Sequence, residues 1–324
     1  MKRLIMLAAA IGLAAPSPAT AQADLAEWPV ERGGRTRDPY VAPDGKVWFV
    51  GQAGNYVANF DPESAAVRYY EIEEGTNPHT LIVDPQGFVW YAGNRNGRIG
   101  RLDPATGEAR IFMTGEARDP HTMVFDGRGS IWFTSQGSNR VGRLNMTSGQ
   151  VDLVTPWETP SNPYGIVMDD QGNPWVALLR TNMVVRIDPS TLELTHFEQA
   201  TEESRARRLA WTSDGMIWYV DEPRGYLGRI DTATGEVREW QTPGGPGSRP
   251  YAITKDDQER LWLSETGPTK QLVGFDPRTE RFFSVNQVSG SIRNMYFHAQ
   301  TAAMWFGTDA NNVGRIVTRQ VVSQ

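Results

Sequence analysis

Three side chains suited to acid–base chemistry follow prolines at nearly equal intervals along the chain. His79 and His121 each come directly after a proline, and Tyr164 does so one interval later. Histidine exchanges a proton near neutral pH, and a tyrosine hydroxyl can donate to or orient a substrate oxygen. Only four histidines occur in the 324 residues, so two of them in the same local setting indicate a positioned pair.

These three residues belong to a repeat that runs along most of the chain. A polar turn such as DPQG or DGRG precedes an apolar-Trp pair, and a motif like NGRIGRLDPATG follows it. A fixed period of this length is the signature of a propeller or a solenoid. The repeated tryptophans, spaced 42 to 44 residues apart, are Trp48, Trp90, Trp132, Trp175, Trp218, Trp262 and Trp305.

The segments inside each repeat read as β-strands. VWYAG, RIGRL and EARIF are short, rich in branched or aromatic residues, and bounded by Gly, Asp and Pro turns, while no segment sustains a helical period. Four strands per repeat, seven repeats and a closed ring predict an all-β, seven-bladed β-propeller of about 42–44 residues per blade. Residues 24–324 are expected to form this single domain.

The two ends of this domain are expected to meet in one sheet. The last repeat stops after NVGRIVTRQVV and lacks an outermost strand, whereas LAEWPV near the start resembles VREWQT at 237–242. We therefore predict that Leu25 to Val30 completes the seventh blade. This closure removes an exposed strand edge.

The residue eleven positions before each tryptophan is polar or aromatic in every repeat. If the first strand of each blade lies innermost, these seven side chains meet at one mouth of the propeller. His121, His79 and Tyr164 are the catalytic candidates, and the remaining four are candidates for binding an anionic or carbonyl-rich substrate. In ring order the set, which we call the mouth ring, is Arg37, His79, His121, Tyr164, Arg207, Tyr251 and Asn294.

Carboxylates near the same mouth are candidates for binding a cation. Asp221 and Glu265 each lie three residues after a repeat tryptophan. Hard cations need several oxygen ligands, and the spacing of these residues predicts no compact metal motif. Asp119, two residues before His121, is expected to orient that histidine or to raise its pKa.

At these residues the chain resembles the virginiamycin B lyase (streptogramin lyase) family of seven-bladed propellers. The phrases NGRIGRLDP, GSIWFT and NPYGIVMDDQG are similar to the repeats of that family, over nearly all of the chain after the leader. The resemblance implies opening of an antibiotic lactone ring by β-elimination, with a magnesium ion. It makes His121 the general base, His79 a substrate contact and Tyr164 the site tyrosine.

The sequence departs from the family pattern at the metal ligands. Asp119 stands where the resemblance implies a metal-binding glutamate, and it is one methylene shorter. A second metal-binding glutamate is implied near 135 or 136, where this chain has Ser135 and Gln136.

The start of the chain and its charge indicate where the protein acts. Basic Lys2 and Arg3, an apolar run from Leu4 to Ala15 and a small-residue site predict a signal peptide over 1–21, with cleavage near Ala21–Ala23 and a periplasmic destination. Without the two basic residues the formal charge goes from −6 to −8, which argues against nucleic acid and anionic membranes as partners. We expect no membrane insertion, a small polar or anionic ligand, and a monomer.

Three functions remain open at this point. The first is a lyase acting on a cyclic ester through His121. The second is a metal-dependent lactonase-type hydrolase relying on Asp221 and Glu265. The third is a non-catalytic propeller that binds a ligand or a protein on its broad face, because a fold alone does not establish an activity.

Overall fold

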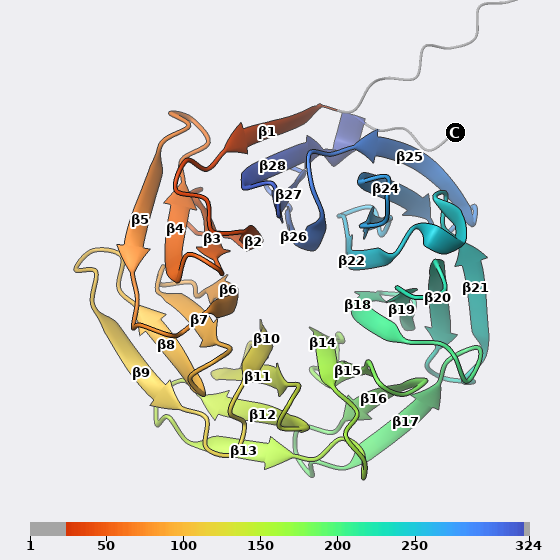
Figure 1. The fold of residues 1–324 in the computed structure, drawn as a ribbon. Coiled ribbons are helices and arrows are strands. Elements are labelled where there is room, and N and C mark those ends of the chain that lie inside the picture. The colour runs from red at the N-terminus through yellow and green to blue at the C-terminus, as the bar shows by residue number, and fades with distance from the viewer. Residues whose placement is uncertain (1–23, 321–324) are drawn as a thin grey trace, which may run out of the picture.

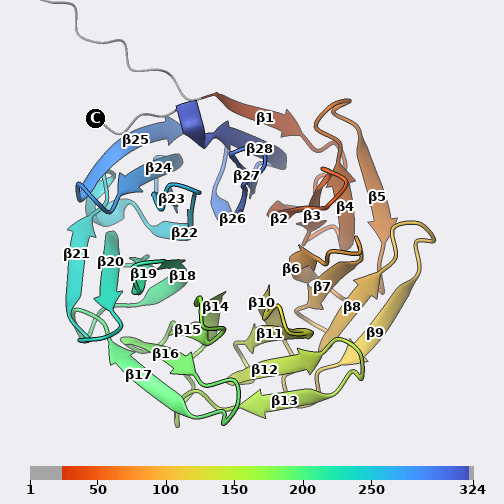
Figure 2. The same ribbon diagram turned by 180° about the vertical axis from the view of Figure 1, so that it is seen from behind.

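The computed structural model describes residues 24–320, and their strands form seven four-stranded antiparallel sheets arranged in a ring (Figures 1 and 2). The described part is nearly all strand, with two short 3-10 turns at Gly245–Gly247 and Thr318–Gln320. The predicted seven-bladed β-propeller is confirmed. No helix in residues 24–320 is long and apolar enough to cross a membrane. The signal sequence expected over 1–21 lies outside the described residues.

Each blade runs from an inner strand beside the ring axis to an outer strand at the rim (Figure 1). The inner strands are β2 (Thr36–Val41), β6 (Pro78–Val83), β10 (Pro120–Phe125), β14 (Pro163–Met168), β18 (Ala206–Thr212), β22 (Pro250–Lys255) and β26 (Ile292–His298). The second strands are β3 (Val47–Gly51), β7 (Val89–Gly93), β11 (Ser130–Ser135), β15 (Pro174–Leu178), β19 (Met216–Asp221), β23 (Leu261–Glu265) and β27 (Ala303–Thr308).

The third strands are β4 (Tyr56–Phe60), β8 (Arg98–Leu102), β12 (Arg140–Asn145), β16 (Met183–Ile187), β20 (Tyr226–Asp231), β24 (Gln271–Asp276) and β28 (Asn312–Val317). The outer strands are β5 (Val67–Glu71), β9 (Ala109–Met113), β13 (Val151–Val154), β17 (Leu194–Glu198), β21 (Val237–Gln241), β25 (Arg281–Gln287) and β1 (Leu25–Pro29). We call the end of the ring where the inner strands begin the entry end, and the end where they finish the exit end.

The repeat tryptophans are buried in the second strands, and in three blades an aspartate of the preceding polar turn accepts the indole N–H of the tryptophan six residues later. In the second blade the Asp84 carboxylate accepts hydrogen bonds from the backbone N–H of Gln86 and Phe88, and its other oxygen accepts the Trp90 indole N–H at 2.9 Å. A buried indole N–H without a partner would be costly. The turn aspartate therefore shapes the turn and pairs the tryptophan six residues later.

The ring is closed as the sequence predicts, because β1 joins the last blade. It pairs antiparallel with β28, from Leu25 opposite Ile316 to Pro29 opposite Asn312. The Trp28 ring lies 6.0 Å from that of Trp305 in the same blade and 5.1 Å from that of Phe60 in the first blade. The strand thus adds hydrogen bonds to one blade and aromatic contacts to the next.

All seven inner strands share a break in register near their beginning. In β6, Pro78 pairs with Gly93, but the next paired residue is Leu81, opposite Tyr91. The same irregularity occurs in the other six inner strands. A bulge of this kind re-aims side chains that would otherwise alternate between the two faces of a sheet. Here it brings consecutive residues, such as His79 and Thr80, into the contacts described next.

Candidate functional site

The mouth ring predicted from the sequence is assembled at the entry end. His79 and His121 are neighbours, with ring centroids 3.3 Å apart, and His121 lies 4.4 Å from the ring of Tyr164. The Arg207 guanidinium lies over two tyrosines, 4.8 Å from Tyr164 and 4.5 Å from Tyr251. Arg37 and Asn294 join the set through a shared partner, described below. All seven predicted residues therefore belong to one cluster around the axis.

The hydrogen bonds of the two histidines indicate which ring nitrogen carries the lone pair. Nδ1 of His79 lies 3.2 Å from the backbone carbonyl of His121, which can only accept, so we assign the proton to this nitrogen. Nδ1 of His121 lies 2.9 Å from the Thr122 hydroxyl, and its Nε2 lies 3.4 Å from the Gln136 amide nitrogen. An amide nitrogen donates, so Nε2 is assigned as the acceptor. In both histidines Nε2 is the basic atom.

The surroundings keep both imidazoles neutral. His79 is 4% exposed and His121 is 3% exposed. Burial holds the pKa of His79 well below its usual range, and the positive charges of Arg37 and Arg208 act in the same direction. Burial, the neighbouring His79 and Arg208 lower the pKa of His121 in the same way. Each histidine is therefore a proton acceptor at neutral pH.

Asp38 is a buried site residue that the sequence analysis missed. Its carboxylate accepts hydrogen bonds from Nε of Arg37 at 2.9 Å and from the Thr80 hydroxyl at 2.8 Å. It also accepts from the Asn294 amide at 3.3 Å and from Arg208, across the ring, at 3.4 Å. Burial alone would raise the pKa of Asp38, but the charges of Arg37 and Arg208 outweigh it and hold that pKa below its usual range.

Asp38 and Arg208 each follow a predicted residue by one position, so alternation along a strand predicts that they point away from the axis. The bulge in each inner strand brings them to the axis instead. The one signal for Asp38 in the sequence was its acidic side chain inside a strand expected to be buried, where a charge needs a partner.

The tyrosines of the mouth ring form a pair at the same end. The hydroxyls of Tyr164 and Tyr251 are in hydrogen-bond contact, and both residues are 4% exposed. Arg207, beside them, forms an ion pair with Glu222. Glu222 also accepts from Arg249 at 2.6 Å. Glu222 thus holds an exposed arginine and a ring arginine together above the tyrosine pair.

Asp119 does not contact His121, contrary to the expectation that it orients that residue. Its carboxylate accepts from the hydroxyls of Ser135 and Ser138, at 2.5 and 2.8 Å, and from the backbone N–H of Gly137 at 2.6 Å. Both oxygens are used to hold the loop after β11, because donors of Ser135, at the end of that strand, and of Gly137 and Ser138, in the loop, converge on them. The side chain that contacts His121 is Gln136, at a position where the family resemblance implies a metal-binding glutamate.

The candidate metal ligands lie apart from one another, each with its own donor. Asp221 forms an ion pair with Arg224 at 2.9 Å, and Oε1 of Glu265 accepts from the backbone N–H of Gly244 at 2.9 Å. Within residues 24–320, no group of three or more His, Cys, Asp or Glu side chains is placed to hold a metal ion. A hard cation such as Mg²⁺ needs several converging oxygens, so the residues present do not fit it.

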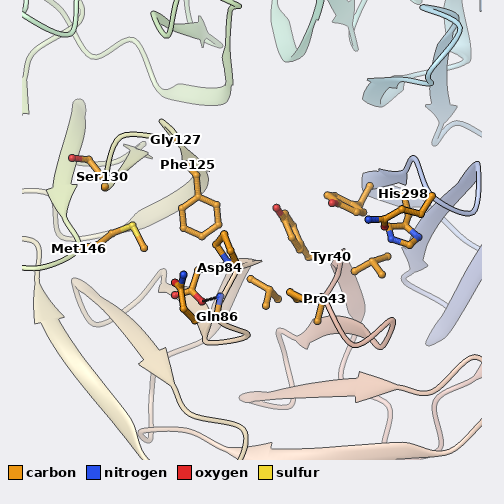
Figure 3. Close-up of a pocket in the computed structure, with 16 residues that line it drawn as sticks. Tyr40, Pro43, Asp84, Gln86, Phe125, Gly127, Ser130, Met146 and His298 are labelled. Carbon is orange, nitrogen blue, oxygen red and sulfur yellow. Dashed lines mark hydrogen bonds between the residues drawn. The ribbon is translucent and has the colours of Figure 1, made fainter.

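A separate concavity of about 510 Å³ lies at the exit end of the ring (Figure 3). Tyr40, Phe125 and His298, at or near the ends of three inner strands, line it together with Gln86 and Met146. The Tyr40 ring contacts that of Tyr296, with centroids 4.2 Å apart. None of the mouth-ring residues lines this concavity. It is distinct from the candidate site.

Solved structures with the same fold include virginiamycin B and streptogramin B lyases. Virginiamycin B lyase from Staphylococcus aureus matches with 22% identity over 91% of this chain and 99% of its own, at a TM-score of 0.82. A streptogramin B lyase structure matches with 23% identity over 93% and 99% of the two chains, also at 0.82. A catalytically inactive variant of the S. aureus lyase, solved with quinupristin, matches at 0.83 with 22% identity over 91% and 99%.

No curated protein matches the chain. At the identities above, the likeness to the solved structures shows the fold alone. The model of the virginiamycin B lyase family, in contrast, matches residues 23–316 and so covers nearly all of the sequence. This chain is therefore a member of the virginiamycin B lyase family.

Proposed function

We propose that the protein is a carbon–oxygen lyase of the periplasm that opens a cyclic ester by β-elimination, with His121 as the general base. One observation carries the proposal: the rings of His79, His121 and Tyr164, from three consecutive inner strands, lie in contact at the entry end of the propeller. Membership of the virginiamycin B lyase family supports the reaction class. The predicted signal peptide over 1–21 supports the location, which release by osmotic shock tests.

The hydrogen bonds of His121 suit the removal of a proton from carbon. Its Nε2 carries the lone pair, and Thr122 fixes the ring through Nδ1. A proton on the carbon next to a carbonyl goes to Nε2, electron density moves onto the carbonyl oxygen as an enolate, and the C–O bond at the β carbon then breaks. The leaving group is the carboxylate of the opened ester. No water is consumed, and a carbon–carbon double bond forms.

Two groups of the cluster can stabilise the charges that develop in this reaction. Arg207 is the partly exposed arginine of the ring, with 19% of its side chain accessible, and it can pair with the enolate or the released carboxylate. The Tyr164 hydroxyl can donate a hydrogen bond to the same oxygen. The carboxylates of residues 24–320 do not converge on a position from which a metal ion could take part in these steps.

The proposal is tested with a type B streptogramin and a panel of other cyclic esters. Loss of the starting compound is followed for the wild type and for His121→Asn, which keeps a polar side chain but removes the base. We expect the variant to be slower by about 10²–10⁴-fold, the usual contribution of a positioned base. His298→Asn, at the exit end, is the matched control and should keep wild-type turnover.

Full turnover by His121→Asn would overturn the assignment of the base. A compound that binds and is released unchanged by the wild type would favour the non-catalytic propeller. Activity lost on chelation but kept by His121→Asn would favour the lactonase-type hydrolase.

A further inference from the structure

His121, the general base proposed above, is covered in the structure. Only 3% of its surface is exposed, and its Nε2, the atom that would take the proton, lies 3.4 Å from the amide nitrogen of Gln136. A base removes a proton only from an atom within hydrogen-bond reach. A substrate carbon can therefore reach Nε2 only after a neighbouring side chain has moved.

Most neighbours of His121 are fixed by burial. Its ring contacts those of His79 and Tyr164, and its Nδ1 lies 2.9 Å from the Thr122 hydroxyl. These three residues are each 4% exposed. Gln136 is partly exposed, so it is the contacting side chain that can turn toward solvent.

The backbone on either side of Gln136 is anchored, while its side chain is held weakly. Asp119 accepts from the Ser135 hydroxyl at 2.5 Å before it and from the backbone N–H of Gly137 at 2.6 Å after it. Within residues 24–320, the contact with His121 is the one hydrogen bond of the Gln136 side chain, and its length of 3.4 Å lies beyond the usual range. A change of side-chain rotamer is therefore enough to uncover Nε2.

Two other blades place a side chain over the mouth ring from the same position, directly after the second strand. In the first blade, Oε1 of Gln52 accepts from Arg37 at 3.0 Å, and in the fifth blade Glu222 forms an ion pair with Arg207. Gln136 differs from both because its partner is a proton acceptor, so its amide N–H groups are the atoms that point to the site. The fold thus uses this position to bring polar groups to the mouth.

The amide gains a second role once a substrate is bound. The proposed reaction removes a proton from the carbon next to a carbonyl, so the carbonyl oxygen lies two bonds from that carbon and close to Nε2. The Gln136 amide starts beside Nε2 and offers two N–H donors. It can therefore reach the oxygen on which the enolate charge develops, where a hydrogen-bond donor accelerates the reaction.

We propose that Gln136 covers Nε2 of His121 in the free protein, turns aside when a cyclic ester binds, and then donates an amide N–H to the ester carbonyl. The inference rests on the lyase function proposed above and adds a catalytic residue to it. Gln136 would act on the carbonyl oxygen together with Arg207 and Tyr164.

The cover is tested without any substrate. Diethyl pyrocarbonate acylates the unprotonated nitrogen of accessible histidines, and mass spectrometry of the peptides gives a rate for each histidine. The minor state of a two-state side chain is populated to about 0.1–10%, so Gln136→Ala should label His121 at least about tenfold faster than the wild type does. His196 and His298 serve as internal references.

Thr266→Ala is the matched control, because Thr266 lies directly after the second strand of the sixth blade and its hydroxyl donates to a backbone carbonyl. It should label His121 at the wild-type rate. Equal rates for the wild type and Gln136→Ala would overturn the cover. Melting temperatures establish that the variants are folded.

The donor is tested by the turnover of cyclic esters with Gln136→Met, which keeps the length of the side chain but has no N–H group. Loss of one donor to a developing oxyanion should lower kcat by about 10²-fold and leave KM little changed. An unchanged kcat would overturn the donor role. Absence of turnover by the wild type would contradict the proposed lyase itself, whereas the labelling rates decide the cover independently.

Discussion

His79 and His121 lie where an imidazolium would be poorly tolerated. Both are buried, their ring centroids are 3.3 Å apart, and the positive charges of Arg37 and Arg208 disfavour protonation of both. Protonating either one would place a further positive charge beside the arginines of the ring. The cluster therefore favours two neutral imidazoles with Nε2 available as a proton acceptor.

This arrangement predicts a loss of stability on mild acidification. The folded-state pKa of each histidine is lowered, so below about pH 6.5 the unfolded chain binds more protons than the folded protein. Each histidine should reduce the free energy of unfolding by up to about 1.4 kcal/mol per pH unit as the pH falls below that value. Thermal unfolding between neutral pH and pH 5 measures the slope.

His79→Gln should flatten this dependence, because a neutral side chain then occupies one of the two positions. His298→Gln is the control, since that residue lies at the exit end, where its Nδ1 is 2.9 Å from the Thr301 hydroxyl. Equal slopes for the wild type and His79→Gln would contradict the assignment of a buried neutral imidazole.

Two structural features shape the strands that position the site, and only the first of them can be predicted from the sequence. The turn aspartates and repeat tryptophans recur with the motif, so the blades and their number are predictable from spacing. The bulges of the inner strands do not appear as an insertion in any one repeat, because all seven strands have them. For that reason the ring of His79, His121 and Tyr164 was predictable, whereas Asp38 and Arg208 were not.

The closing strand β1 offers a test at the level of one element. Deletion of residues 24–30 removes the hydrogen bonds to β28 and the contacts of Trp28 with Trp305 and Phe60. It also exposes the edge of β28. We expect the melting temperature to fall by several degrees, because each kcal/mol lost corresponds to roughly 2 °C in a domain of this size. An unchanged melting temperature would contradict closure by this strand.

In the whole molecule, one buried carboxylate ties opposite parts of the ring together. Asp38 lies on β2 of the first blade and Arg208 on β18 of the fifth, and these strands face each other across the axis in Figure 2. The two side chains form an ion pair at 3.4 Å. Asp38→Asn keeps the size of the side chain but leaves Arg37 and Arg208 without a counterion. Removal of one partner of a buried ion pair costs about 3–5 kcal/mol.

Asp44→Asn is the matched control for this loss, measured by chemical denaturation. Asp44 is in the same blade and pairs with Lys46 at 3.0 Å, but its side chain is 56% exposed. Exposed pairs contribute about 0–1 kcal/mol. Similar losses in the two variants would contradict the role of Asp38 as the counterion of the ring.

The site contacts that the sequence did not predict join residues that are distant along the chain. Gln136, directly after β11, contacts His121, and the next residue of the same loop, Gly137, donates to Asp119. The Tyr164–Tyr251 contact joins residues 87 positions apart. The repeat predicted that these side chains share one end of the ring, but only the folded chain shows which of them touch.

The central claim, opening of a cyclic ester by elimination at the mouth of this propeller, is tested most directly by the mass of the product. A type B streptogramin is incubated with the purified mature protein, and the product is examined by mass spectrometry and ultraviolet absorbance. Elimination predicts a ring-opened product of unchanged mass with the absorbance of a new double bond. A product heavier by one water would contradict the account, because it would show hydrolysis.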